Sequence, residues 1–137
     1  MLATVASAVL AVGLLLAATA PQAQAAPAIT DHGVAQLAAS INNYRAGQGL
    51  GQLAVDADLT TQARACALAL AREGALRHCQ SGEIVQYNTY GSPHAWLVAF
   101  QNSPSHNAIM LLPDITSIGG GVTLSPGGRY YSVINVA

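Results

Sequence analysis

The chain has 137 residues, of which 52% are hydrophobic and 8% are charged, and its formal net charge at pH 7 is −1. This length accommodates one domain. All five basic residues are Arg and they form no basic stripe, which argues against nucleic acid or an anionic membrane surface as the partner.

The N-terminal stretch is almost continuously apolar and leads into a small-x-small triplet, Ala23-Gln24-Ala25. This pattern predicts a secretory signal peptide at residues 1–25. No Lys or Arg precedes the apolar run, which leaves open a true initiator upstream of Met1. A retained anchor helix is the alternative, since about 20 apolar residues can span a bilayer. We expect cleavage and export, then a short segment at residues 26–34 and one domain at residues 35–137, with no membrane association after cleavage.

An amphipathic helix is predicted first, beginning at Asp31 and ending at Gly47 and Gly49. Its apolar residues recur at steps of three and four: Val34, Leu37, Ile41 and Tyr44. Near its end, Arg45 is expected to bond to backbone carbonyls or to a carboxylate. An extended stretch over residues 50–55 follows.

A second helix is predicted to begin at a cap formed by Asp56 or Asp58 and to end at Gly74. The residues expected on its buried face are Leu59, Ala63, Cys66, Ala67 and Leu70. Because Ala dominates this face, we expect something large to pack close against it.

Two cysteines, Cys66 and Cys79, suit an exported protein with one disulfide. Such a bridge closes a loop of roughly 15 residues and is worth about 3 kcal/mol in the chain-entropy model. It would tie the second helix to the segment that carries His78. Two free thiols, with Cys66 as a small core residue, are the alternative.

Turn-forming residues dominate residues 80–92, which we therefore expect to lack regular structure. A third helix is predicted to begin after Ser92, with Pro93 at its first position. Trp96 and Phe100 lie four residues apart on this helix and are expected in the core.

The end of the chain is predicted to hold a short helical stretch and a hairpin. Residues 102–105 end the third helix, and residues 106–111 form the short stretch. Residues 117–124 and 130–136 are rich in β-branched and aromatic residues and are expected to pair as a hairpin. The glycines at 119–121 suggest a close backbone approach or a bulge.

Short motifs follow one another in a specific order over residues 35–136. They are Ile41-Asn42-Asn43-Tyr44-Arg45, Gly49-Leu50, Asp58-Leu59, Gly82-Glu83, Asn102-Ser103-Pro104-Ser105-His106, Ile118-Gly119-Gly120-Gly121-Val122 and Tyr130-Tyr131-Ser132-Val133. In order and spacing the chain resembles the bacterial branch of the CAP superfamily, named for cysteine-rich secretory proteins, antigen 5 and plant pathogenesis-related proteins. The resemblance implies an α+β fold, a three-layer α/β/α sandwich with a central, mostly antiparallel sheet and an open cleft.

In the wider family that cleft is lined by two His and two acidic residues. By their positions in the motifs, His78 and His106 match the two His, and Glu83 matches the Glu of the Gly-Glu-Asn-Ile motif. His94 stands where the family's Ser-Pro-Glu motif opens the third helix. The second acidic residue is therefore not evident, which weakens a four-ligand metal site.

Two imidazoles and a carboxylate suit more than one chemistry. Zinc or a similar divalent ion accepts them and leaves a position for water, so His78, His106 and Glu83 are candidate ligands, with His94 as a speculative third imidazole. The same three groups could instead form a hydrogen-bonded cleft in which Glu83 orients one His. In a purely structural alternative, His78 caps the second helix, Glu83 pairs with an Arg, and His106 is a solvated turn residue.

We expect an exported, monomeric CAP-domain protein that binds a ligand or a partner, and we lean against an enzyme. The expected ligand is a small hydrophobic molecule such as a lipid, or an extracellular protein. Two alternatives stay open: a zinc-dependent hydrolase that uses the His/Glu cleft, and an extracellular structural scaffold. No cofactor beyond a divalent metal is implied.

Overall fold

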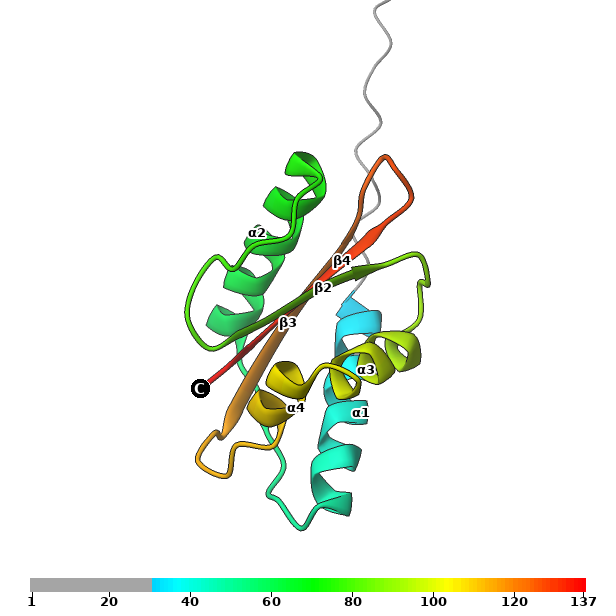
Figure 1. Cartoon of the computed structure of the whole chain (residues 1–137). Helices are drawn as coiled ribbons and strands as arrows, with labels where there is room; N and C mark the ends of the chain where they lie inside the picture. Colours follow the sequence, from blue (N-terminus) through cyan, green and yellow to red (C-terminus); the bar gives the residue numbers. More distant parts are fainter. Residues whose placement is uncertain (1–30) are drawn as a thin grey trace, which may run out of the picture.

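A four-stranded sheet lies between two layers of helices (Figure 1). The computed structural model describes residues 31–137, without the side chains of Asp31 and His32. The predicted signal peptide at residues 1–25 lies outside the described residues, as does most of the segment that follows it. None of the described helices is long and apolar enough to cross a bilayer.

Eight elements follow one another along the described part of the chain. The helices are α1 (Asp31–Gly47), α2 (Ala57–Glu73), α3 (Pro93–Gln101) and α4 (Pro104–Met110). The strands are β1 (Ala54–Val55), β2 (Glu83–Asn88), β3 (Ser117–Leu124) and β4 (Tyr130–Val136).

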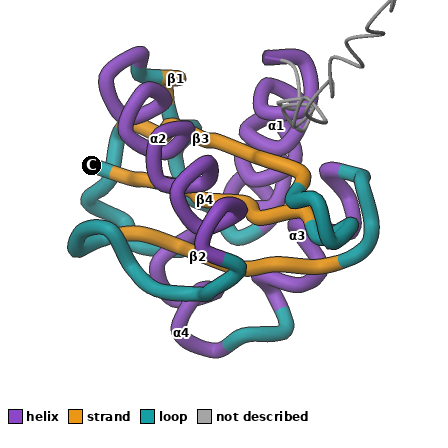
Figure 2. Tube along the Cα trace, turned by 90° about the horizontal axis from the view of Figure 1, so that it is seen from above, coloured by secondary structure: helices purple, strands orange, loops and turns teal. Residues whose placement is uncertain are grey.

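The strand order is β1-β3-β4-β2, and Figure 2 shows β3, β4 and β2 running side by side. The two-residue strand β1 pairs parallel to β3, whereas β3–β4 and β4–β2 are antiparallel. Helix α2 covers one face of this sheet, and α1 and α3 lie on the other side (Figure 1). The predicted α+β class and three-layer arrangement around a mostly antiparallel sheet are confirmed.

Each face of the sheet has its own apolar core, because alternate residues of a strand point to opposite faces. On the side of α1 and α3, Trp96 and Phe100 are fully buried with Leu37 and Ile41, as the sequence predicted for the two aromatic residues. On the side of α2, the buried cluster is smaller in side-chain volume: Ala63, Cys66, Ala67, Leu70, Ala71, Val85, Tyr131 and Val133.

The Ala-rich face of α2 packs against the backbone of β3 more than against large side chains. A Cβ added to Gly119 would overlap the backbone of Leu59 and Thr60, and one added to Gly121 would overlap the backbone at Ala63. The glycines therefore allow the close approach that the sequence suggested. The expected large group is largely the strand itself, with Tyr131 and Leu70 filling the rest of the layer.

Residues 80–92 were predicted as turns, and this is wrong for residues 83–88. They form β2, which pairs with β4 from Glu83↔Asn135 to Asn88↔Tyr130. Both faces of β2 are covered near its start, so its buried positions include Glu83 and Gln86 and no alternation of apolar and polar residues appears. Its pairing partner is also distant in sequence, which a local pattern cannot indicate.

The helix ends follow their capping residues. Of the two predicted caps, Asp56 and Asp58, it is Asp56 that accepts a hydrogen bond from the N–H of Leu59. Gly74 ends α2 with φ 66°. Ser92 caps α3, with Pro93 at its start. The short helix expected from His106 begins two residues earlier, at Pro104, because proline suits the first turn of a helix.

Arg45 joins three parts of the fold, although its side chain is buried. Its guanidinium donates to the backbone carbonyls of Gly51, Met110 and Leu112, each at 2.8 Å. The predicted bonding to carbonyls is confirmed, and it anchors the end of α1 to the segment between α4 and β3.

Candidate functional site

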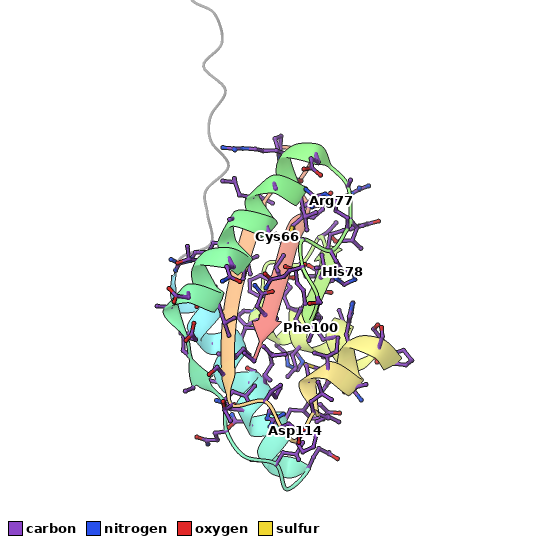
Figure 3. The ribbon with its side chains drawn as sticks, turned by 90° about the vertical axis from the view of Figure 1, so that its left-hand side faces the viewer. Cys66, Arg77, His78, Phe100 and Asp114 are labelled. Carbon is purple, nitrogen blue, oxygen red and sulfur yellow. A yellow bond between two sulfur atoms is a disulfide. The ribbon has the colours of Figure 1, made fainter. Side chains whose placement is uncertain are left out.

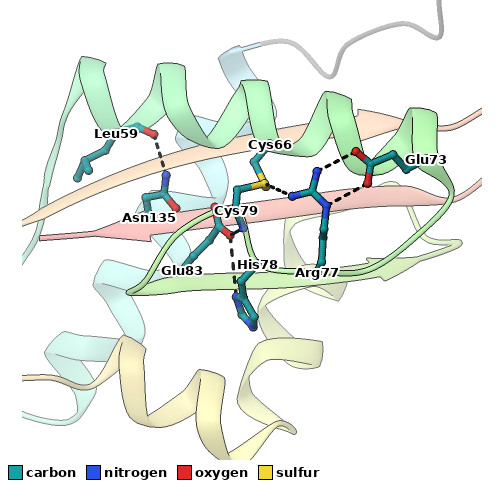
Figure 4. Close-up of a disulfide and its surroundings, with 8 residues drawn as sticks. All are labelled: Leu59, Cys66, Glu73, Arg77, His78, Cys79, Glu83 and Asn135. Carbon is teal, nitrogen blue, oxygen red and sulfur yellow. Dashed lines mark hydrogen bonds and ion pairs between the residues drawn. A yellow bond between two sulfur atoms is a disulfide. The ribbon is translucent and has the colours of Figure 1, made fainter.

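Glu83 is buried and hydrogen-bonded in the candidate site. It opens β2, its side chain is 1% exposed, and its Oε2 accepts a hydrogen bond from the N–H of Cys79 at 2.7 Å. Cys79 is in turn joined by a disulfide to Cys66 on α2, with 6.0 Å between the two Cα atoms (Figure 4). The predicted disulfide is therefore present, and it holds the loop that contacts Glu83.

His78 precedes the disulfide and lies at the surface, with its side chain 59% exposed. Its Nδ1 is 3.9 Å from Glu83 Oε2, which is an electrostatic contact longer than a hydrogen bond. The neighbouring Arg77 turns to α2 instead, where it donates to both carboxylate oxygens of Glu73 at 2.8 and 3.0 Å. Figure 4 shows His78 and Arg77 leaving the loop in different directions.

His106 comes from another element, α4, and is half-buried. Its ring meets the Phe100 ring edge to face, with 6.0 Å between ring centres. The pKa of His106 is lowered, first because burial disfavours the charged imidazole and second because His78 is a like charge nearby. Because His78 affects this pKa, the two imidazoles lie near each other although they come from different elements. Figure 3 labels His78, in the loop after α2, and Phe100, whose ring His106 contacts.

His94 is exposed in the first turn of α3. No hydrogen bond, ion pair or ring contact among the described residues joins it to His78, Glu83 or His106. His94 therefore adds no contact to the site in this structure.

The three candidate ligands fit zinc by chemical type but are not assembled around one point. Within the described part of the chain, the three metal-capable groups whose ligand atoms lie within 4.8 Å of one another are Cys66, Cys79 and Glu83, and both sulfurs are bonded to each other. Zinc ligands lie about 2.0–2.3 Å from the ion, so they must converge closely. To hold a metal, the side chains of His78, Glu83 and His106 would have to move closer to one another.

Asn135 is a member of the site that sequence reasoning missed. It lies directly opposite Glu83 in the β2–β4 register, is 1% exposed, and donates weakly to the carbonyl of Leu59 at 3.4 Å. Asn135 Oδ1 and Glu83 Oε1 are both buried, and neither has a hydrogen-bond donor among the described residues. The available signal was a single amide side chain within the otherwise apolar end of β4.

The sequence over residues 38–136 matches the family model described as the cysteine-rich secretory protein family, CAP. The chain belongs to the CAP family. No match was found among proteins with curated descriptions.

Solved structures share the CAP fold at low sequence identity. An outer surface protein of Borrelia burgdorferi is 20% identical with a TM-score of 0.70, over 80% of this chain and 95% of that one. An extracellular SCP-domain protein of Bacillus anthracis is 17% identical with a TM-score of 0.65, over 78% of this chain and 41% of that one. The hookworm platelet inhibitor is 16% identical with a TM-score of 0.60, over 80% and 70%. The CAP domain described here thus corresponds to about two fifths of the Bacillus protein.

Proposed function

We propose that this CAP-family protein is an exported binding module, and that it takes its ligand at the face formed by His78, Glu83 and His106. The observation that supports this is the arrangement of these three groups. The carboxylate is buried and fixed by the Cys79 N–H, whereas the imidazoles stay apart and reach solvent from two different elements. Such a face offers hydrogen bonds to a ligand without the convergence that metal-assisted hydrolysis needs.

Export is supported by three independent features. The apolar N-terminal run ends in a small-x-small triplet, and the protein carries a disulfide, which persists in oxidising compartments. In addition, similar structures come from a protein named for the outer surface and from one described as extracellular.

The chemistry of this face suits a molecule with a polar head and an apolar body, such as a lipid. The lowered pKa of His106 keeps its imidazole neutral near pH 7, so that it can both donate and accept a hydrogen bond. Leu76, in the same loop as His78, is 50% exposed and offers apolar contact.

A lipid-transfer assay tests this proposal. The purified protein is incubated with phosphatidylcholine vesicles that carry a fluorescent fatty acid or a fluorescent sterol, and the probe that leaves with the protein is counted. We expect stoichiometric binding that His78→Ala weakens about tenfold, the effect of losing one hydrogen bond to a ligand. His94→Ala is the matched control and should bind as the wild type does.

Calorimetric titration with zinc chloride separates the hydrolase alternative from the binding module. If zinc binds with one-to-one stoichiometry, and both His78→Ala and His106→Ala abolish the heat, the face assembles around a metal and the proposal is wrong. Absence of transfer for both probes would exclude lipid as the ligand. If transfer is the same in both His variants as in the wild type, the ligand binds at another place on the protein.

A further inference from the structure

A hollow of about 370 Å³ lies at the C-terminal end of α2. It is bordered by the last turn of α2, residues 71–74, and by the β3–β4 turn, residues 125–129, with Tyr131 reaching it from β4. These two segments lie side by side at one end of the molecule (Figure 1). We call it the α2–hairpin hollow. Its volume is at the lower end of the range of small-molecule sites.

The charges around the α2–hairpin hollow are predominantly positive. Arg72 and Arg129 both line it. Glu73 also lines it, but its two carboxylate oxygens are taken up by Arg77, whose hydrogen bond lowers the pKa of Glu73. Neither Arg72 nor Arg129 has a carboxylate partner within the described part of the chain. The hollow thus holds two guanidinium groups that no carboxylate of the described residues pairs with, in a protein with only five basic residues.

Arg129 is oriented by a pair of neighbouring aromatic rings. The centre of its guanidinium lies 4.8 Å from the centre of the Tyr87 ring, and that ring lies 5.7 Å from the ring of Tyr131. A cation–π contact restrains the guanidinium but leaves its charge and its N–H donors available. The Arg129 guanidinium is therefore partly ordered in the free protein, and this reduces the entropy lost when a ligand binds.

The carbonyl end of α2 acts against anion binding, but the arginines outweigh it. A helix C-terminus carries the equivalent of about half a negative charge. One of its carbonyls, that of Leu70, accepts a hydrogen bond from the N–H of Gly74, which reduces this effect. Two full positive charges therefore exceed the opposing partial charge. Ala71, Pro126 and Tyr131 supply apolar surface beside them.

We propose that the α2–hairpin hollow is a binding site for a small organic anion, a carboxylate or phosphate carried on an apolar or aromatic body. The two guanidiniums would bind the anion by charge-assisted hydrogen bonds, and the apolar wall would cover the body. The site is distinct from the His78 face and does not depend on the function proposed for it.

The test is an NMR titration of the ¹⁵N-labelled protein with phenyl phosphate. We expect saturable shifts at the amides of Gly74, Gly127 and Arg129. Phenylacetate shows whether a carboxylate is preferred to a phosphate, benzyl alcohol tests the need for a charge, and inorganic phosphate tests the need for the ring. We expect Arg72→Gln and Arg129→Gln each to weaken binding about tenfold, as expected for a lost charged hydrogen bond.

Two variants make the result specific. Arg64→Gln removes the same charge from the exposed middle of α2 and should bind almost as the wild type does. His78→Ala should also leave the affinity unchanged, so that failure here is distinguishable from failure of the His78 face. The proposal is overturned if phenyl phosphate gives no saturable shifts, if benzyl alcohol binds equally well, or if Arg64→Gln weakens binding as much as the two hollow variants.

Discussion

At the scale of single residues, His106 gives the protein a defined response to pH. Its pKa is below the ordinary value of 6.5 because it is half-buried and because His78 is nearby. As pH falls below about 6.5, the unfolded chain takes up this proton before the folded chain does. The His106 contribution to the free energy of unfolding therefore decreases with falling pH until the folded pKa is passed. Urea unfolding between pH 7.5 and 5.5, compared with His106→Gln, measures this slope.

The His78→Gln variant separates the two causes of the lowered pKa. Removing the nearby positive charge should raise the pKa of His106, read from its ring proton shifts in an NMR titration. Burial against Phe100 remains in this variant, so the pKa should stay below 6.5. A His106 pKa that does not move would mean that the two imidazoles do not share one face.

The residues of the site differ in how far the sequence could predict them. His78, Glu83 and His106 are chemically conspicuous in a chain with few charged residues, and motif order indicated their places. Asn135 became part of the site only through its register opposite Glu83. The resemblance to the family motif made His94 a candidate ligand. Its exposure at the start of α3, however, depends on how that helix packs, which the motif does not indicate. Register and helix packing are set by tertiary contacts, which local patterns do not encode.

At the scale of elements, the approach of α2 to β3 depends on glycine. We predict that Gly121→Ala lowers the free energy of unfolding by about 3 kcal/mol, at the upper end for overpacked cores, because the added methyl would meet the helix backbone, which cannot swing aside. Gly47→Ala is the matched control. It ends α1 with open space around it, so its stability should be unchanged or slightly raised. Urea denaturation of both variants measures the difference, and a loss at Gly121 below about 1 kcal/mol would contradict it.

Helix α2 was predictable because it carries its own start and stop signals, Asp56 and Gly74. The strand β2 carries no comparable local signal. Its buried positions include Glu83 and Gln86, and turn residues stand on both sides of it. It is stable because β4 supplies its hydrogen bonds and two helical layers cover its faces, and both of these arise only when the whole chain folds.

At the scale of the whole molecule, the disulfide connects one helical layer to the candidate site. Cys66 is buried on α2, and Cys79 follows His78 directly and gives its N–H to Glu83. The residues from Arg72 to Gly82 are exposed, so little burial restrains this loop. The bridge is therefore the main covalent restraint that keeps His78 beside Glu83.

We predict that the Cys66→Ala/Cys79→Ala variant loses about 3 kcal/mol of folding free energy, since the unfolded chain regains the freedom of the closed loop. Hydrogen exchange should become faster at residues 75–82, whereas the β3–β4 pairing should keep its protection because it does not depend on the bridge. If His78 moves away when the bridge is removed, the pKa of His106 should also rise, as it should in His78→Gln. Mass spectrometry of the wild-type protein provides the first check, because an oxidised pair is about 2 Da lighter than two thiols. If the double variant kept its full stability and the slow exchange of the loop, packing would hold the site and the bridge would be dispensable.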